Sequence, residues 1–415
     1  MEKNNKKVLI IGSSAKEYAL AKKFSEYEHV SEVFVASGNV AMKEFCTCVD
    51  IREQNVQELL EFAVSNDIDL TIATSELAIK ADIATYFQTN GQLIFAPTAQ
   101  SADFVISKSL GKKLLYKLRI PTPRFGTYDK EAMANDYLKN SNYPVVIRTD
   151  ENLLGDRLVC NSFNFAKTFV SDLFLTGEAR VLIEDYAYGH EFTFYVITDG
   201  YSVLPLTSVA NYKFSEDGDA GLLTSGVGAF APDYKVTAET QKYLMKNMVS
   251  NVLNSLEYRQ TPYLGILGVD CVLKDDGKLT ALEFRPFLSD NDCQCVLNLI
   301  EEDLYELFES CSNGAFGDVY PEVKFSDSVS VSCVLSSKVK DSVILGLEQV
   351  DEVEIGHFAT RQNEYFETLA PLGNALVVTK TAKTLARASK CVYENIDLIK
   401  FEGKKYRKDI CPVVE

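Results

Sequence analysis

Short apolar runs alternate with helical patterns over the first hundred residues. The apolar runs predict strands at 7–11, 33–36, 70–73 and 93–96, and the stretches between them predict helices at 17–24, 56–63 and 77–87. Strands this short, separated by helices, are typical of a parallel, doubly wound sheet. Ligands of such sheets bind beyond the carboxyl ends of the strands, so we expect the loops at 12–14, 37–39 and 74–76 to border one crevice.

The pattern changes after residue 105. A leucine stripe predicts a helix at 108–118, which ends before Pro121 and Pro123. Strand patterns joined mostly by short turns follow, and then a polar loop and a long helix. The strands lie at 143–148, 158–160, 180–186, 191–198 and 202–207, the loop at 215–228 and the helix at 238–256.

A β-hairpin and a mixed segment complete the chain. The hairpin strands, 266–273 and 278–284, are joined by the turn sequence Asp275-Asp276-Gly277. A helix at 296–307, strands at 329–335 and 376–379 and a helix at 382–393 come after it. We therefore predict four parts: a parallel α/β domain at 1–105, a linker helix and lid at 106–190, a central domain at 191–325, and a small mixed domain at 326–415.

Composition excludes several functional classes. The chain has 42 Lys and Arg against 59 Asp and Glu, a net charge of −17, and an acidic surface repels a nucleic-acid backbone. Local lysines and helix N-termini can still hold a small anion. No apolar run approaches the roughly 20 residues of a membrane span. Because the basic segment 1–7 lacks a signal-peptide core, we expect a cytoplasmic protein. Its ten cysteines lack zinc-site spacing, so we expect reduced thiols.

The first loop favours no dinucleotide cofactor. The sequence Gly12-Ser13-Ser14-Ala15 has one glycine where a dinucleotide-binding turn has three. A plain strand-to-helix turn is the better interpretation of this loop taken alone.

The hairpin carries the most informative pair of residues. Alternation along the strands places Asp270 on one face with Val272 and Lys274, and Glu283 on one face with Arg285. Two inward carboxylates must be neutralised. Mg²⁺ that bridges nucleotide phosphates is one neutraliser, and a salt-bridge cluster with Arg285 is another. The spacing leaves both open.

The order of these features resembles the ATP-grasp superfamily. A parallel domain, a Ser107-Lys108 helix start, an antiparallel lid and a hairpin bearing Asp and Glu follow one another as they do there. The local sequences are closest to the phosphoribosylamine–glycine ligase family, and the resemblance covers nearly the whole chain. The matching segments are 7–20, 37–39, 75–76, 95–98, 107–108, 182–186, 189–191 and 401–410.

The resemblance implies a fold and a reaction. The fold would be a parallel doubly wound amino-terminal domain, an ATP-grasp lid and central domain, and a small mixed carboxy-terminal domain. The reaction would join glycine to 5-phosphoribosylamine through a glycyl phosphate, giving glycinamide ribonucleotide, ADP and phosphate in purine biosynthesis. The resemblance implies ATP and Mg²⁺ (or Mn²⁺) as cofactors. We expect a monomer whose partners are small-molecule substrates, with no nucleic acid and no membrane.

The resemblance also assigns roles to individual residues. Lys108 and Arg148 would contact ATP phosphates, Glu184 and Glu191 would bind adenine and ribose, and Asp270 and Glu283 would hold Mg²⁺. The acceptor pocket would contain Gly12, Asn39 and Glu76, with Thr224, Gly226 and Gly228 at the reacting end. Lys213, Arg148 and Arg285 would act in catalysis.

Three segments depart from the family pattern. The lid loop, 148–157, keeps only Gly155 of the family's glycines, which let backbone N–H groups approach phosphate. Asp150, Glu151 and Asp156 would bring three negative charges toward a triphosphate there, answered by Arg157. Arg285 stands where the family has a metal-binding Asn. Segments 283–292 and 371–375 each lose a family Arg.

Three functions remain open at this point. The first is a working ligase with a divergent site. The second is a catalytically impaired relative that binds nucleotide or a partner, and the third is an ATP-grasp ligase for another carboxylate and amine. A working ligase is favoured because the residues that would bind ATP and Mg²⁺ are all retained in this sequence. Its members are Lys108, Glu184, Glu191, Asp270 and Glu283.

Overall fold

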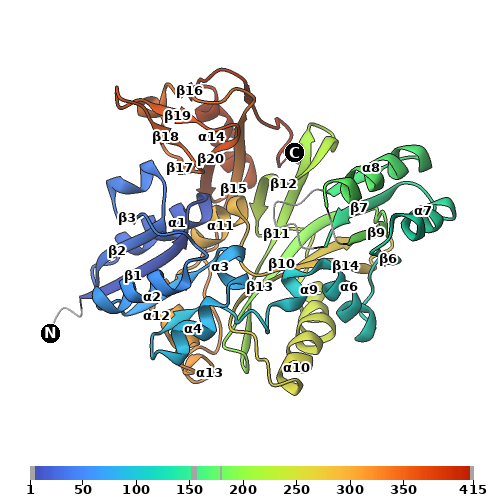
Figure 1. Cartoon of the computed structure of the whole chain (residues 1–415). Coiled ribbons are helices and arrows are strands. Elements are labelled where there is room, and N and C mark those ends of the chain that lie inside the picture. Colours follow the sequence, from blue (N-terminus) through green and yellow to red (C-terminus); the bar gives the residue numbers. More distant parts are fainter. Residues whose placement is uncertain (1–4, 151–156, 178–179, 412–415) are drawn as a thin grey trace.

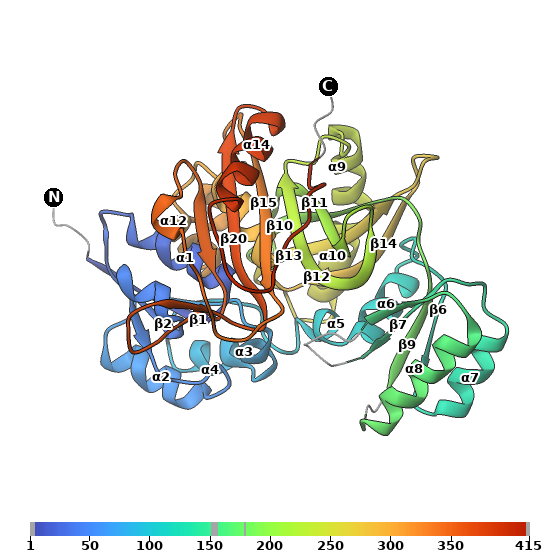
Figure 2. The same ribbon diagram turned by 90° about the horizontal axis from the view of Figure 1, so that it is seen from above.

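The computed structural model describes residues 5–150, 157–177 and 180–411. Figure 1 shows an amino-terminal unit and a lid on opposite sides of a large central sheet, and Figure 2 shows the same arrangement from above. Within the described ranges, no helix is long and apolar enough to cross a membrane.

The amino-terminal unit is a parallel sheet of five strands in the order β3-β2-β1-β4-β5. This confirms the predicted parallel sheet. The strands are β1 (Lys6–Gly12), β2 (Val30–Ser37), β3 (Thr47–Val49), β4 (Leu70–Ala73) and β5 (Ile94–Phe95), and the helices are α1 (Ala15–Ser25), α2 (Val56–Ser65), α3 (Glu76–Lys80) and α4 (Ile83–Thr89).

Two predicted helices are each broken in the structure. The helix expected at 77–87 is divided into α3 and α4 because Asp82 adopts a left-handed backbone with φ of 58°. The bounds predicted for the helix at 296–307 were wrong. Its place is taken by α11 (Asp290–Leu297) and α12 (Leu304–Ser312), and the Asp303 side chain accepts hydrogen bonds from the first backbone N–H groups of α12. An N-cap of this kind starts a new helix.

The lid is an antiparallel sheet in the order β6-β9-β7-β8, with two helices packed on one face. Its strands are β6 (Phe125–Tyr128), β7 (Val145–Thr149), β8 (Arg157–Cys160) and β9 (Val181–Asp185), and its helices are α7 (Glu131–Lys139) and α8 (Phe163–Leu175). Two short helices, α5 (Asp103–Ile106) and α6 (Lys108–Lys117), connect it to the amino-terminal unit.

The central sheet has nine strands and continues into the carboxy-terminal segment through the pairing of β12 with β15. The four-part division stays a prediction, and the boundary placed at 325 lies between strands of one sheet. The strands are β10 (His190–Thr198), β11 (Val203–Glu216), β12 (Ala220–Ala231), β13 (Gly265–Leu273), β14 (Leu279–Arg285), β15 (Val329–Ser337), β17 (Glu354–His357), β20 (Gly373–Ala382) and β21 (Lys404–Lys405).

The remaining elements belong to none of the three sheets described above. The helix predicted at 238–256 is α9 (Ala238–Leu244) and α10 (Ser250–Tyr258), joined by a π-helical turn at Met245–Val249. The others are α13 (Phe316–Val319), α14 (Leu385–Ile396), β16 (Ser342–Val343), β18 (Arg361–Gln362), β19 (Thr368–Ala370) and short 3₁₀ turns at Val40–Glu44 and Leu347–Gln349.

The loop predicted at 215–228 is wrong, since most of it is strand β12, paired antiparallel with β11. The first half of β12 is largely exposed, which explains why its sequence reads as polar. The predicted hairpin, in contrast, is confirmed as β13 and β14, with Asp270 opposite Glu283.

Candidate active site

Asp270 is held by three neighbouring side chains at the centre of the β13–β14 hairpin. The Arg285 guanidinium donates from Nε and Nη2 to its two carboxylate oxygens, at 2.7 and 2.8 Å. Lys213 Nζ on β11 lies 2.7 Å from Oδ2, and Thr193 Oγ1 donates to Oδ1 at 2.7 Å. Asp270 has no exposed surface. Burial would raise the pKa of Asp270, but Arg285 and Lys213 hold it well below its ordinary value.

Glu283 meets cations from the lid and from α6. Arg148 Nη1 lies 2.9 Å from its Oε2, and Arg157 Nη1 lies 3.1 Å from its Oε1. Lys108 Nζ is 3.4 Å from Oε2. Burial again opposes ionisation, yet these cations hold the pKa of Glu283 well below the usual range. The lid and the hairpin are therefore joined through one carboxylate.

Two further carboxylates complete the charge network. Arg148 Nη2 bonds Glu184, which also pairs with Lys112 Nζ at 2.5 Å. Lys213 contacts Glu191 as well as Asp270. We call the whole set the cation cluster. Among described residues it contains six cations and four carboxylates, an excess of two positive charges: Lys108, Lys112, Arg148, Arg157, Lys213 and Arg285 with Glu184, Glu191, Asp270 and Glu283.

The predicted metal site at Asp270 and Glu283 does not fit this arrangement. The two carboxylate oxygens of Asp270 already accept from Arg285, Lys213 and Thr193, so a metal ion would have to displace one of these donors. In the ranges that the structure describes, no group of three or more His, Cys, Asp or Glu could hold a metal ion. The salt-bridge interpretation of the hairpin matches the observed contacts.

Asp150 is turned away from the cluster, contrary to the expectation that it faces phosphate. Its carboxylate accepts from Ser109 N at 2.6 Å and from Ser109 Oγ at 2.8 Å, at the start of α6. Arg180 Nη1 lies 3.2 Å from it. A carboxylate is favourable at a helix N-terminus. The other predicted acidic positions of this loop, Glu151 and Asp156, and Gly155 lie outside the described residues.

A cavity of about 410 Å³ opens beyond the carboxyl ends of β1 and β4. Four of the predicted site residues line it, namely Gly12, Glu76, Gly226 and Arg285. Gly12 and Gly226 have φ of 143° and 134°, a region that favours glycine. A Cβ on Gly12 would lie 2.4 Å from the Glu17 carboxyl carbon. Gly12, at the end of β1, and Gly226, within β12, therefore require glycine because of their backbone conformation.

Asn39 and Gly228 are not among the residues that line this cavity. The Asn39 amide donates to Phe358 O at 2.8 Å and accepts from Ala41 N at 3.0 Å, so its expected place in the pocket does not fit the structure. A Cβ on Gly228 would overlap the Ile410 side chain. Both residues contact the carboxy-terminal segment, Asn39 at Phe358 and Gly228 at Ile410.

Thr224 lies beside the cluster rather than in the cavity. Its hydroxyl donates to Lys213 O at 2.7 Å, and its carbonyl accepts from Arg157 Nη2 at 3.2 Å. This part of β12 is thus bonded both to β11 of the central sheet and to the lid.

Two buried residues of the site have no role in the sequence prediction. Glu17 lines the cavity, accepts from Ser14 N at 2.8 Å and bonds Thr74, and burial raises its pKa. Asp292 lies behind Asp270, bonded to Tyr195 Oη at 2.6 Å, and burial raises its pKa too. Both residues have polar neighbours in the sequence, so no local pattern marks them as buried.

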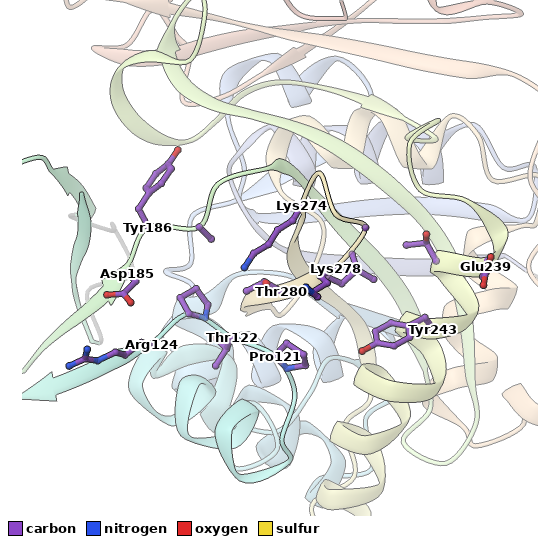
Figure 3. A pocket seen from close by; sticks show the side chains of 15 residues that line it. Pro121, Thr122, Arg124, Asp185, Tyr186, Glu239, Tyr243, Lys274, Lys278 and Thr280 are labelled. Carbon is purple, nitrogen blue, oxygen red and sulfur yellow. The ribbon is translucent and has the colours of Figure 1, made fainter. Parts of the chain in front are cut away.

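A second cavity, of about 880 Å³, lies between the lid and the hairpin (Figure 3). Asp185 and Tyr186 from the end of β9 border one side, and Lys274 and Thr280 from the hairpin border another. The segment 182–186, which contains the predicted nucleotide-binding residue Glu184, therefore reaches this cavity at its last two residues. Glu184 does not line it, because its side chain is buried in the cation cluster.

Comparison with known proteins shows which protein family the chain belongs to. The ATP-grasp (A) domain of phosphoribosylglycinamide synthetase matches residues 106–293, and the N domain of the same enzyme matches residues 6–104. The phosphoribosylamine–glycine ligase of Halalkalibacterium halodurans is 31% identical over 415 residues, covering 97% of this chain and 96% of the relative. This chain belongs to the phosphoribosylamine–glycine ligase family.

Other similar proteins agree with this placement. The phosphoribosylamine–glycine ligase of Neisseria meningitidis is 30% identical over 422 residues, covering 97% of this chain and 98% of the relative. The crystal structure of the Thermotoga maritima ligase has a TM-score of 0.82 at 22% identity, covering 97% of this chain and 100% of that one. The biotin carboxylase domain of Hydrogenobacter thermophilus 2-oxoglutarate carboxylase, solved with MgADP, has a TM-score of 0.72 at 13% identity, with 97% and 91% covered. The range that matches the ATP-grasp domain, residues 106–293, contains every residue of the cation cluster.

Proposed function

We propose that this chain is an ATP-dependent carbon–nitrogen ligase that joins glycine to 5-phosphoribosylamine and forms glycinamide ribonucleotide, ADP and phosphate in purine biosynthesis. Family membership over the full length supports the reaction. One structural observation supports the proposed location of the active site: Arg285 belongs to the cation cluster and also lines the 410 Å³ cavity. A triphosphate at the cluster and an acceptor in the cavity would therefore meet at one side chain.

The chemistry is two displacements. A glycine carboxylate oxygen attacks the γ-phosphorus of ATP, and ADP leaves, which gives glycyl phosphate. The amine nitrogen of phosphoribosylamine then attacks the glycyl carbonyl carbon, phosphate leaves and the nitrogen loses a proton. The mixed anhydride is reactive, so the protein mainly positions the reactants, stabilises phosphate charge and excludes water.

The described residues suit these tasks. Lys108, Arg148 and Arg157 present cations between the lid and the hairpin, where they would bind the transferred phosphoryl group. Glu191, whose side chain keeps a quarter of its surface exposed, would bind the ribose. The adenine would lie against Tyr186 in the larger cavity, with the amine acceptor in the smaller one. These placements are proposals, as is a cytoplasmic monomer with small-molecule partners.

A coupled assay of ADP release tests the function. The purified chain is supplied with ATP, Mg²⁺ and glycine, with and without freshly made phosphoribosylamine. We expect release that requires both glycine and the amine, and that falls at least tenfold in Lys108→Met. Lys390→Met, an exposed residue of α14, is the control and should keep full activity. Release that ignores either substrate contradicts the proposal.

The saturated ion pairs of the cluster favour one alternative, a catalytically impaired relative that binds nucleotide. Nucleotide affinity without any ADP release would identify it. ADP release with a carboxylate or amine other than glycine and phosphoribosylamine would instead identify an ATP-grasp ligase of different specificity.

A further inference from the structure

Arg285 is placed to bind both Asp270 and a ligand. Its Nε and Nη2 are bonded to Asp270. A guanidinium has five N–H donors, so three remain, and none has a hydrogen-bond partner among the described residues. The side chain is 18% exposed and lines the 410 Å³ cavity. Its free donors are therefore available to an anion from the side of the cavity.

Asp270 cannot easily give up this partner to a metal ion. The Thr193 hydroxyl lies within hydrogen-bond distance of Asp270 Oδ1 and of Asn211 Oδ1, at 2.7 and 2.6 Å, and its single hydrogen can be donated to one of them at a time. Asn211 Nδ2 donates to Asp292 at 2.9 Å. This partly buried chain of contacts supports the carboxylate on the side of Asp292. The cation in front of it is held by two charge-assisted bonds, which are the strong kind.

The charge balance of the cluster agrees with a reduced need for metal. The cluster has an excess of two positive charges among described residues. A nucleoside triphosphate carries about four negative charges near neutral pH. One divalent cation would therefore make the occupied site neutral, whereas two would leave it positive. With Asn in place of Arg285, one divalent cation would leave the occupied site with a net charge of about −1.

We propose that Arg285 serves as a fixed cation in place of one divalent ion at the nucleotide phosphates, so that this chain binds nucleotide with about one Mg²⁺ and retains measurable affinity with none. The inference rests on the proposed nucleotide site. It concerns how that site is neutralised, which the family reaction alone does not determine.

Calorimetric titration of ADP and of a non-hydrolysable ATP analogue tests the inference, in Mg²⁺ and in chelator. In the wild type we expect chelation to weaken binding by less than about tenfold. We expect the logarithmic slope of the ATP analogue's affinity against Mg²⁺ to stay below one, because this slope reports the number of ions taken up on binding. A slope of about one or more, or loss of all binding in chelator, overturns the inference without the use of any variant.

Arg285→Asn provides the second arm. We expect metal-free binding to weaken by about tenfold or more, since charge-assisted hydrogen bonds are lost, and binding in Mg²⁺ to depend more steeply on the ion. Arg387→Asn is the matched control, because Arg387 is an exposed residue of α14 paired with Glu352. Equal metal dependence in wild type and Arg285→Asn overturns the inference while the proposed ligase stands. No nucleotide binding under any condition overturns the proposed function, and the inference with it.

Discussion

Arg148 should act as the main electrostatic link between the lid and the hairpin. It lies at the end of β7, is almost fully buried, and bonds Glu283 of β14 through Nη1. The informative perturbation is a double-mutant cycle of Arg148→Met and Glu283→Gln. Such a cycle isolates the energy of the pair from the other effects of each substitution.

The expected coupling follows from the geometry. The Nη1 to Oε2 distance is 2.9 Å and both side chains are mostly buried, which is the setting of a strong charged hydrogen bond of about 1.5–3 kcal/mol. Glu283 keeps Arg157 and Lys108 when Arg148 is removed. These remaining cations relieve part of the penalty of an unpaired charge, so we expect a value toward the lower end, about 1.5–2 kcal/mol.

Urea unfolding followed by circular dichroism measures the cycle. The chain has no tryptophan, so a probe of backbone structure is preferable to native fluorescence. The matched control is the exposed pair Arg387–Glu352, for which a cycle should give less than about 1 kcal/mol. A coupling between Arg148 and Glu283 no larger than that of the surface pair would refute the view that this bond holds the lid.

Three further predictions concern single positions. Asp150→Ala should cost about 1–2 kcal/mol of stability, because the first turn of α6 loses the carboxylate that accepts from Ser109 N and Oγ. Nucleotide affinity should change little, and a large gain in affinity would show that this charge faces phosphate after all. Folding lowers the pKa values of Asp270 and Glu283, so the stability that these carboxylates confer is complete above the unfolded pKa of about 4 and is lost as the pH falls through the folded values. In an acid titration, Glu283→Gln should therefore lose less of its free energy of unfolding between about pH 5 and 2 than the wild type does. Gly226→Ala should cost about 1–3 kcal/mol through its positive φ and lower ADP release, and wild-type behaviour in urea unfolding and in the ADP assay would contradict that strain.

Local patterns predicted much of the fold. Alternation along the hairpin strands predicts that Asp270 shares a face with Val272, and that Glu283 shares one with Arg285. The pairing of Asp270 with Glu283 depends on a register shift between Asp270 and Cys271, which the sequence pattern does not reveal. The short apolar runs and helical patterns of the first hundred residues likewise predict the parallel sheet. Strand β12 escaped prediction because its exposed half has no apolar face to reveal it.

The charge network could not be predicted from local sequence. Arg148 and Arg157 reach Glu283 across sequence separations of 135 and 126 residues. The contact of Asp150 with Ser109 spans 41 residues, so the resemblance of the lid loop to the family pointed Asp150 toward phosphate and did not reveal its contact with the start of α6. Hairpin spacing alone left metal and salt bridge equally open, and the choice between them depends on cations that only the tertiary fold brings together.

Oxygen transfer from glycine tests the central claim most directly. Glycine labelled with ¹⁸O in its carboxylate is incubated with the chain, ATP, Mg²⁺ and phosphoribosylamine, and the released phosphate is examined by mass spectrometry. If the carboxylate attacks the γ-phosphorus at the cation cluster, each phosphate released carries one labelled oxygen and appears together with one ADP and one glycinamide ribonucleotide. Phosphate that carries no label would show that water, and not glycine, is the acceptor of the phosphoryl group, and would contradict the account.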